Sequence, residues 1–181
     1  MSKAVMLSVR PKWCEKIARG EKTIEVRKTR PKLDTPLKCY IYCTLPKYPH
    51  EDFIATNYPM PQFYGGGKVV GEFTCDRIYE IRKRGIPENF DYCYLSLNEW
   101  GNDDIETEIR AISASCVSKE ELNAYGAKAP LIYGWHISDL RIYDAPRELS
   151  EFTGLRNTRF GAAPYDIKRA PQSWCYVEAM K

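Results

Sequence analysis

Charged side chains alternate with apolar ones in the stretch "GEKTIEVR" near the N-terminus. In an extended segment successive side chains point to opposite faces, so Ile24 and Val26 share one face. Glu25 and Arg27 share the other, and Lys22 lies just before them. Lysine and arginine can bind an anion or a carbonyl group, and a buried glutamate can act as a general base. Lys22, Glu25 and Arg27 are therefore candidate site residues.

The same stretch has a simpler interpretation, in which the three charges form a salt-bridged row on an exposed sheet face. Such a row stabilises a fold by about 1 kcal/mol or less. The eight residues alone favour this interpretation over a site. Further observations along the chain are needed to decide between the two.

Positive charge is concentrated at the two ends of the sequence. Residues 1–32 carry ten Lys or Arg and three Glu, a local charge of +7. Since the whole chain has a net charge of +3, the other 149 residues together carry −4. A second basic segment interleaves cations with aromatic rings, as RNA surfaces do, although charge alone favours an ordinary solvated face. It carries four cations against one carboxylate, Asp166, and the residues concerned are Arg156, Arg159, Lys168 and Arg169, with the rings of Phe160, Tyr165 and Trp174 between and after them.

Length and composition predict one globular domain over residues 1–181, with 44% hydrophobic and 28% charged residues. No apolar run approaches the roughly 18 residues that cross a bilayer, and no signal-peptide core is found. We therefore expect a cytoplasmic protein without a membrane partner.

Seven cysteines without a CxxC pair predict reduced, mostly buried thiols and no disulfide framework. Cys39 and Cys43 share one face of a predicted strand, but four residues of strand span about 13 Å. That separation is too large for two thiolates bound to one zinc ion. We expect neither a metal site nor a cofactor.

The order of elements predicts an α+β fold with five to six strands and short inserted helices. Pro11 and Gly20 flank a short helix between two strands, and "SKEELNAYG" is a capping box that ends at a glycine. Alternation in "LIYGWHISDLRIY" shifts phase at Ser138 and Asp139, which indicates a bulge or bend. Gly71 indicates a bulge or a close backbone approach. Three segments are expected to lie outside the core strands of this domain: a long loop at about 46–67, a helical insertion at about 82–128 and a C-terminal extension at about 146–181.

The motif and its surroundings resemble the ASCH domains of the PUA-like superfamily, in the versions found in small bacterial and phage proteins. "GEKTIEVR" is similar to the glycine, lysine, glutamate, arginine signature of that family. "LSVRPKWCEKIARG", "CYIYCT", "KVVGEFTCDRI" and "LIYGWHISDLRIYDAP" resemble its first strand and helix and its later strands. The resemblance implies a small mixed β-barrel with a cleft beside the motif.

It also implies binding of RNA or of a modified nucleoside or nucleotide. Arg10, Lys12, Lys22, Arg27 and Trp174 are then the candidate ligand-binding residues. With the resemblance, a cleft lining becomes the favoured interpretation of the motif. A hydrolase acting on a modified nucleoside or on RNA is the alternative, and an adaptor with a protein partner is a further one.

One branch of the family hydrolyses acetylated cytidine with a lysine, a threonine and an acidic residue. Lys22 matches the lysine, but Glu25 occupies the position of the threonine, and a carboxylate cannot replace a hydroxyl nucleophile without a change of mechanism. Lys22 and Glu25 stay candidate catalytic residues, with Glu72 as a guess for the third. His136 is expected to be an ordinary sheet residue rather than a catalyst.

Overall fold

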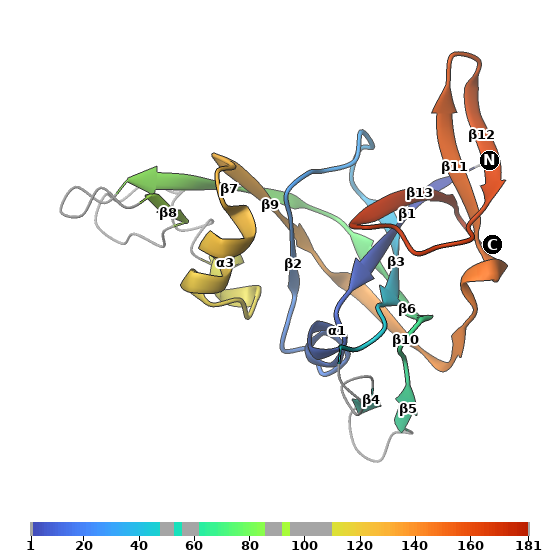
Figure 1. The fold of residues 1–181 in the computed structure, drawn as a ribbon, viewed down its shortest axis with the longest axis horizontal. Coiled ribbons are helices and arrows are strands. Elements are labelled where there is room, and N and C mark those ends of the chain that lie inside the picture. Colours follow the sequence, from blue (N-terminus) through green and yellow to red (C-terminus); the bar gives the residue numbers. More distant parts are fainter. Residues whose placement is uncertain (1, 48–52, 56–61, 86–91, 95–109, 181) are drawn as a thin grey trace.

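The computed structural model describes residues 2–47, 53–55, 62–85, 92–94 and 110–180, which form mostly strands with a few short helices (Figure 1). No helix in this part of the chain is long and apolar enough to cross a membrane. The strands are β1 (Lys3–Val9), β2 (Ile24–Arg27), β3 (Leu37–Cys43), β4 (Phe53–Ala55), β5 (Gln62–Tyr64), β6 (Lys68–Cys75), β7 (Ile78–Gly85), β8 (Tyr92–Tyr94), β9 (Leu131–His136), β10 (Ser138–Arg147), β11 (Thr153–Thr158), β12 (Gly161–Asp166) and β13 (Trp174–Glu178). The helices are α1 (Pro11–Ala18), α3 (Lys119–Gly126), the 3-10 turn η1 (Leu149–Glu151) and a helical segment at 110–114.

Two sheets carry the architecture. The larger one has the order β10-β6-β3-β1-β13-β11-β12, and the smaller one has the order β2-β9-β7-β8. A bent two-stranded ribbon joins them. Strand β6 continues into β7, and β9 continues into β10, while β6 pairs with β10 in the larger sheet and β7 pairs with β9 in the smaller one. The bend lies at Ile137 and Asp139, and Asp139 has a φ of +47°. The predicted phase shift at this point is confirmed.

The strands do not form the predicted barrel of five to six strands. The described residues include thirteen strands, and the strands at the two ends of the larger sheet, β10 and β12, each pair on one side only, with β6 and β11 respectively. Strand β1 cannot close the gap to β2, because β3 and β13 already occupy both of its edges. The barrel prediction is therefore wrong, while the α+β class holds.

The turn before the motif is fixed to the end of α1. Pro11 is the first residue of α1, and Gly20 has a φ of +74°, which L side chains rarely adopt. The backbone N–H of Gly20 donates to Ile17 O at 2.9 Å and that of Lys22 donates to Lys16 O at 3.1 Å. The motif strand therefore starts from a rigid helix end, as the sequence predicted.

Other local expectations are also confirmed. Ser118 and Glu121 form the capping box of α3. A Cβ on Gly71 would lie 2.6 Å from the carbonyl oxygen of Arg141, so only glycine fits this close approach. The β11–β12 hairpin lies inside the predicted C-terminal extension and was not expected from the sequence. Strands β4 and β5 lie within the predicted loop at 46–67.

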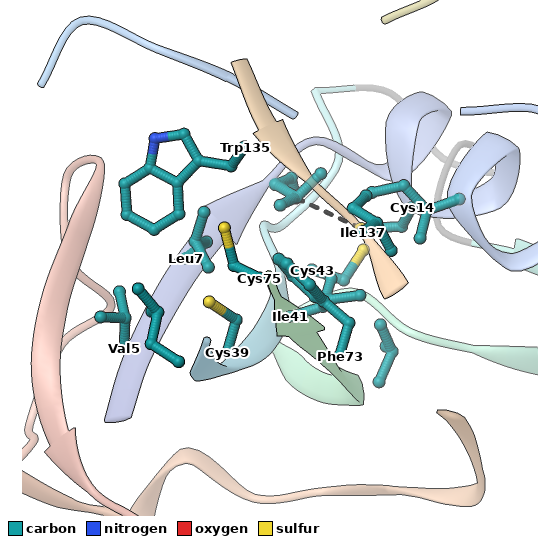
Figure 2. Packing of buried hydrophobic residues seen from close by; sticks show 14 residues of the cluster. Val5, Leu7, Cys14, Cys39, Ile41, Cys43, Phe73, Cys75, Trp135 and Ile137 are labelled. Carbon is teal, nitrogen blue, oxygen red and sulfur yellow. Dashed lines mark hydrogen bonds between the residues drawn. The ribbon is translucent and has the colours of Figure 1, made fainter. Parts of the chain in front are cut away.

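Four of the cysteines are fully buried in the main core, as expected for structural thiols. Figure 2 shows Cys14, Cys39, Cys43 and Cys75 among the apolar side chains of both sheets and α1. Burial raises the pKa of the Cys75 thiol to about 12 and raises the pKa values of Cys14 and Cys39 as well. The thiols of Cys14, Cys39 and Cys75 therefore stay protonated at neutral pH, and all four cysteines pack as small hydrophobic groups.

A second apolar cluster covers the other face of the motif strand. Ile24 and Val26 are 2% and 7% exposed, and they pack with Ile81, Leu122 and Ile132. The predicted alternation along β2 is confirmed, because the apolar residues face this cluster while the charged ones face a cleft on the opposite side.

Candidate functional site

A cleft of about 1060 Å³ lies where β1 and β2 fail to pair. Its walls come from the end of β1, the motif strand β2, helices α1 and α3, and residues 170–173. Arg27 spans the gap between the strands, since its Nη2 donates to the carbonyl oxygen of Ser8 at 2.8 Å. The volume is that of an ordinary small-ligand site.

Lys22 lies at the floor of this cleft and is 1% exposed. Its Nζ donates to Ile24 O at 2.8 Å and to Ser115 O at 2.6 Å, and it lies 3.3 Å from Glu25 Oε2. The Trp13 ring lies 5.0 Å from the same nitrogen. These contacts surround the ammonium group and keep its protons engaged, so Lys22 fixes the motif strand against the segment that follows residues 110–114.

Glu25 lies between two cations. Its Oε1 is 3.0 Å from Arg27 Nη2 and its Oε2 faces Lys22. Glu25 and Arg27 are each 6% exposed, so the interpretation of the motif as an exposed row of charges is wrong. Removing charges from water has a high energetic cost, which the pairing offsets. The floor is a buried triad with one carboxylate and two cations.

The triad is incompletely hydrogen-bonded. Among the described residues, the buried side-chain polar atoms without a hydrogen-bond partner are Glu25 Oε2, Arg27 Nε and Trp135 Nε1. Two of them belong to the floor of the cleft, and Trp135 lies opposite Glu25 in the β2–β9 register. Buried polar atoms are normally paired, and these atoms are covered by the protein, so a ligand group would gain binding energy from them only if the floor side chains turn toward it.

The rim of the cleft is basic. Arg10, Lys12 and Lys28 line it and are exposed. Lys12 reaches across to α3 and pairs with Glu121 at 2.7 Å, and this hydrogen bond lowers the pKa of the Glu121 carboxyl. In the described part of the chain neither Arg10 nor Lys28 pairs with a carboxylate, so both are available to an anion.

Aromatic rings line the same cleft. Trp13 comes from α1, Tyr125 from α3 and Tyr42 from β3. The Lys28 ammonium lies 5.2 Å from the Tyr125 ring, and burial raises the pKa of the Tyr125 hydroxyl. Rings beside cations provide surfaces on which a planar ligand can stack.

Five of the residues selected from the sequence meet in this cleft: Arg10, Lys12, Lys22, Glu25 and Arg27. Trp174 does not line it. Its Nε1 donates to Thr29 Oγ1 at 2.9 Å, and its ring packs against Tyr176.

Two other residues considered from the sequence also lie elsewhere. Glu72 accepts a hydrogen bond from the Tyr143 hydroxyl at 2.7 Å and pairs with Lys38 at 3.1 Å, outside the cleft. His136 lies at the bend between the sheets, and its Nδ1 is 2.6 Å from Asp76 Oδ1. Neither one is positioned to act with Lys22.

Several cleft residues could not be identified from the sequence. Ser8 holds the C-terminal wall, because its hydroxyl donates to Pro171 O at 2.6 Å and its N–H donates to Ser173 O at 3.0 Å. Tyr125 reaches the motif from about a hundred residues away, and so does Ser115, which binds Lys22 but does not line the cleft. No local pattern marks them, although the capping box did locate the helix that carries Tyr125.

No group of three or more His, Cys, Asp or Glu side chains in the described ranges is arranged to hold a metal ion. The donors of the cleft are mainly cationic, which suits an anionic or neutral polar ligand better than a metal.

Comparison of the fold with solved structures finds ASCH domains. A crystal structure of ASCH from Zymomonas mobilis matches with a TM-score of 0.56 at 16% identity, covering 97% of this chain and 87% of that one. A serine-to-alanine variant of the same protein matches with a TM-score of 0.55 at 16% identity, over 97% of this chain and 88% of that one. A tyrosine-to-phenylalanine variant matches with a TM-score of 0.51 at 13% identity, over 98% and 91%.

Neither a family model nor a curated protein matches the sequence. The structural likeness extends over nearly the whole chain, and the chain therefore has the ASCH fold. The resemblance noted in the sequence is confirmed at the level of the fold.

Proposed function

We propose that this ASCH-fold protein binds RNA, through a nucleotide or modified nucleotide held in the cleft beside the motif. The observation that carries the proposal is the convergence of a basic rim, aromatic walls and a buried, incompletely paired ion triad in one cleft. Cations meet phosphates, rings stack on bases, and polar floor atoms pair with a base edge.

Each part of the cleft has a distinct task in this proposal. Arg10 and Lys28 bind phosphate oxygens at the rim, because both are exposed cations that the structure pairs with no carboxylate among the described residues. Trp13 and Tyr125 offer rings to the base. After the floor side chains turn toward the ligand, Glu25 accepts from a donor of the base edge, and Arg27 Nε donates to an acceptor beside it; both atoms are covered by the protein in the structure.

Binding is favoured over hydrolysis by the position of Lys22. Its ammonium group already donates to two carbonyl oxygens and faces a carboxylate, and it is almost fully buried. A nitrogen engaged in this way has no free lone pair for nucleophilic or general-base chemistry. Glu25 is the remaining candidate for a catalytic role.

Fluorescence anisotropy with a labelled single-stranded RNA, measured at several salt concentrations, tests the proposal. The double variant Arg10→Ala/Lys28→Ala should reduce the slope of log affinity against log salt by about 1.4, because each of the two phosphates that is no longer neutralised accounts for about 0.7. Lys16→Ala/Arg19→Ala is the matched control, because both side chains are exposed cations that lie outside the cleft. Equal reductions in the two variants would contradict a site at the cleft.

Chromatography of a panel of acylated and unmodified nucleosides after incubation with the wild type tests the alternative. Product that forms only when Lys22 is present would place hydrolysis ahead of binding. Absence of binding to every RNA at low salt would remove RNA and leave a protein partner as the better interpretation of the cleft.

A further inference from the structure

The hairpin of β11 and β12 extends beyond the larger sheet. The two strands pair over six residues each, from Thr153↔Asp166 to Thr158↔Gly161. Strand β11 also pairs with β13, but only at Gly154 and Leu155. Among the described residues, the strand partners of residues 156–163, called the arm here, are therefore limited to each other, and Figure 1 shows the arm projecting from the body of the protein.

Packing does not explain the arm. Leu155 is buried and anchors the base of the hairpin, whereas residues 156–162 are all exposed. An isolated two-stranded hairpin is only marginally stable in water, so these residues add little to the stability of the fold. Their side chains are better explained by a contact outside the chain.

The side chains of the arm have one charge sign and one aromatic ring at the tip. Arg156 and Arg159 are exposed, and the sequence from 154 to 165 contains no carboxylate. Phe160 is 85% exposed, and the Arg159 guanidinium lies 4.5 Å from its ring. A single exposed phenylalanine is ordinary by itself. An exposed phenylalanine beside an arginine, in a segment without acids, combines two groups that bind single-stranded nucleic acid. The ring stacks on a base, and the cation binds a phosphate.

The arm is connected to the cleft by a basic segment of chain. Strand β12 is followed by Ile167, which is buried as an anchor, and by Lys168 and Arg169, which are exposed. Residues 170–173 then form the wall of the cleft. Asp166 is the one carboxylate in the sequence from 154 to 173. At the base of the arm, Lys3 adds a cation through its contact with Asn157 Oδ1 at 3.4 Å.

We infer that the arm is a second contact for the same RNA, which leaves the cleft along residues 166–173 and reaches the hairpin. Arg156 and Arg159 bind phosphates there, and Phe160 stacks on an unpaired base. The inference rests on the proposed function of the cleft and extends the ligand from a nucleotide to a single-stranded RNA of several nucleotides.

The test compares two labelled single-stranded RNAs, one of about 4 nucleotides that fills the cleft alone and one of about 16 that can reach the arm. Phe160→Ala should lower affinity for the longer RNA about tenfold, because removing the stacking partner of one base has an effect of that order. Arg156→Ala/Arg159→Ala should reduce the salt slope for the longer RNA by about 1.4. Neither variant should change binding of the short RNA.

Two controls accompany these variants. Phe160→Leu keeps an apolar tip without an aromatic face and should resemble Phe160→Ala, while Arg82→Ala removes an exposed arginine from β7 in the other sheet and should change nothing. Thermal unfolding of each variant checks that the fold is intact, which is expected because the arm is exposed.

The outcomes separate the two proposals. If the longer RNA binds no more tightly than the short one, or the arm variants leave it unchanged, the arm inference is wrong and the cleft proposal stands. If the wild type binds neither RNA, both fail. Unlabelled RNA and polyglutamate can each be added, at equal concentration of negative charge, to displace the longer labelled RNA. If polyglutamate displaces it as effectively as unlabelled RNA, the arm is a general polyanion contact and the assignment to RNA is overturned.

Discussion

The floor of the cleft and the arm both present basic residues, yet the structure uses them in opposite ways. At the floor, Lys22 and Arg27 are almost fully buried and share the carboxylate of Glu25. At the arm, Arg156 and Arg159 are exposed, and neither pairs with a carboxylate in the described part of the chain. The residue types are alike, but the surroundings decide what each charge can do.

The difference follows from solvation. A buried charge must have its partner within the fold, because leaving water is costly and the partner offsets that cost. An exposed charge is stabilised by water and is screened within about 10 Å at 0.1 M salt. Replacing a charge at the floor should therefore change mainly the free energy of unfolding. Replacing a charge on the arm should change mainly the salt dependence of RNA binding.

Glu25→Gln should have the largest effect on stability of any change at the floor. The amide keeps the shape of the side chain but leaves Lys22 and Arg27 as buried cations without a counter-charge. Breaking a buried ion pair from one side costs about 3–5 kcal/mol. Urea unfolding followed by circular dichroism would measure this decrease in the free energy of unfolding.

Glu21→Gln is the matched control for that change. Glu21 belongs to the same motif, but its side chain is 48% exposed and lies at 3.8 and 4.0 Å from Lys16 and Arg19. Its replacement should lower the free energy of unfolding by less than about 0.5 kcal/mol. Similar decreases in the two variants would show that burial does not separate the floor from the surface.

Lys22→Met should have a smaller effect, of about 2 kcal/mol, since it removes charged hydrogen bonds but leaves Glu25 paired with Arg27. The double variant Lys22→Met/Glu25→Gln should be destabilised by less than the sum of the single ones, by about 0.5–3 kcal/mol. Strict additivity in the same urea experiment would mean that Lys22 and Glu25 act separately.

The parts of the site that the sequence predicted are those set by local rules. The alternation along β2 follows from the two-residue period of a strand, and the stop at Gly20 follows from its left-handed backbone. Both could be read within a window of eight residues. The resemblance of the motif to a known family then indicated which face would line a cleft.

The parts that were missed depend on distant contacts. Whether β1 pairs with β2 or with β13 is decided by strands more than a hundred residues apart, and no local pattern reports that choice. The burial of Lys22 depends on the carbonyl of Ser115, which lies 93 positions along the chain. The β11–β12 hairpin was missed because "GAAPYD" has small residues and a proline, which do not alternate as a strand usually does.

The contact between Asp76 and His136 lies between these two extremes, with side chains 47% and 33% exposed. A carboxylate can only accept, so the imidazole Nδ1–H donates, and this hydrogen bond lowers the pKa of Asp76. A carboxyl whose pKa is lower in the folded state stabilises the fold above its unfolded pKa of about 3.9. That contribution disappears as the pH falls through the lower, folded value.

Asp76→Asn should therefore destabilise the protein by no more than about 1 kcal/mol at pH 7, as expected for an exposed pair. The difference from the wild type should shrink below about pH 4 and vanish once Asp76 is protonated in both states. Urea midpoints measured between pH 7 and pH 2 would follow it, with Asp144→Asn on β10 as the control, since Asp144 is exposed. A destabilisation as large as that of Glu25→Gln, or one that persists at low pH, would mean that the exposure of an ion pair does not determine how much it contributes to the free energy of unfolding of this protein.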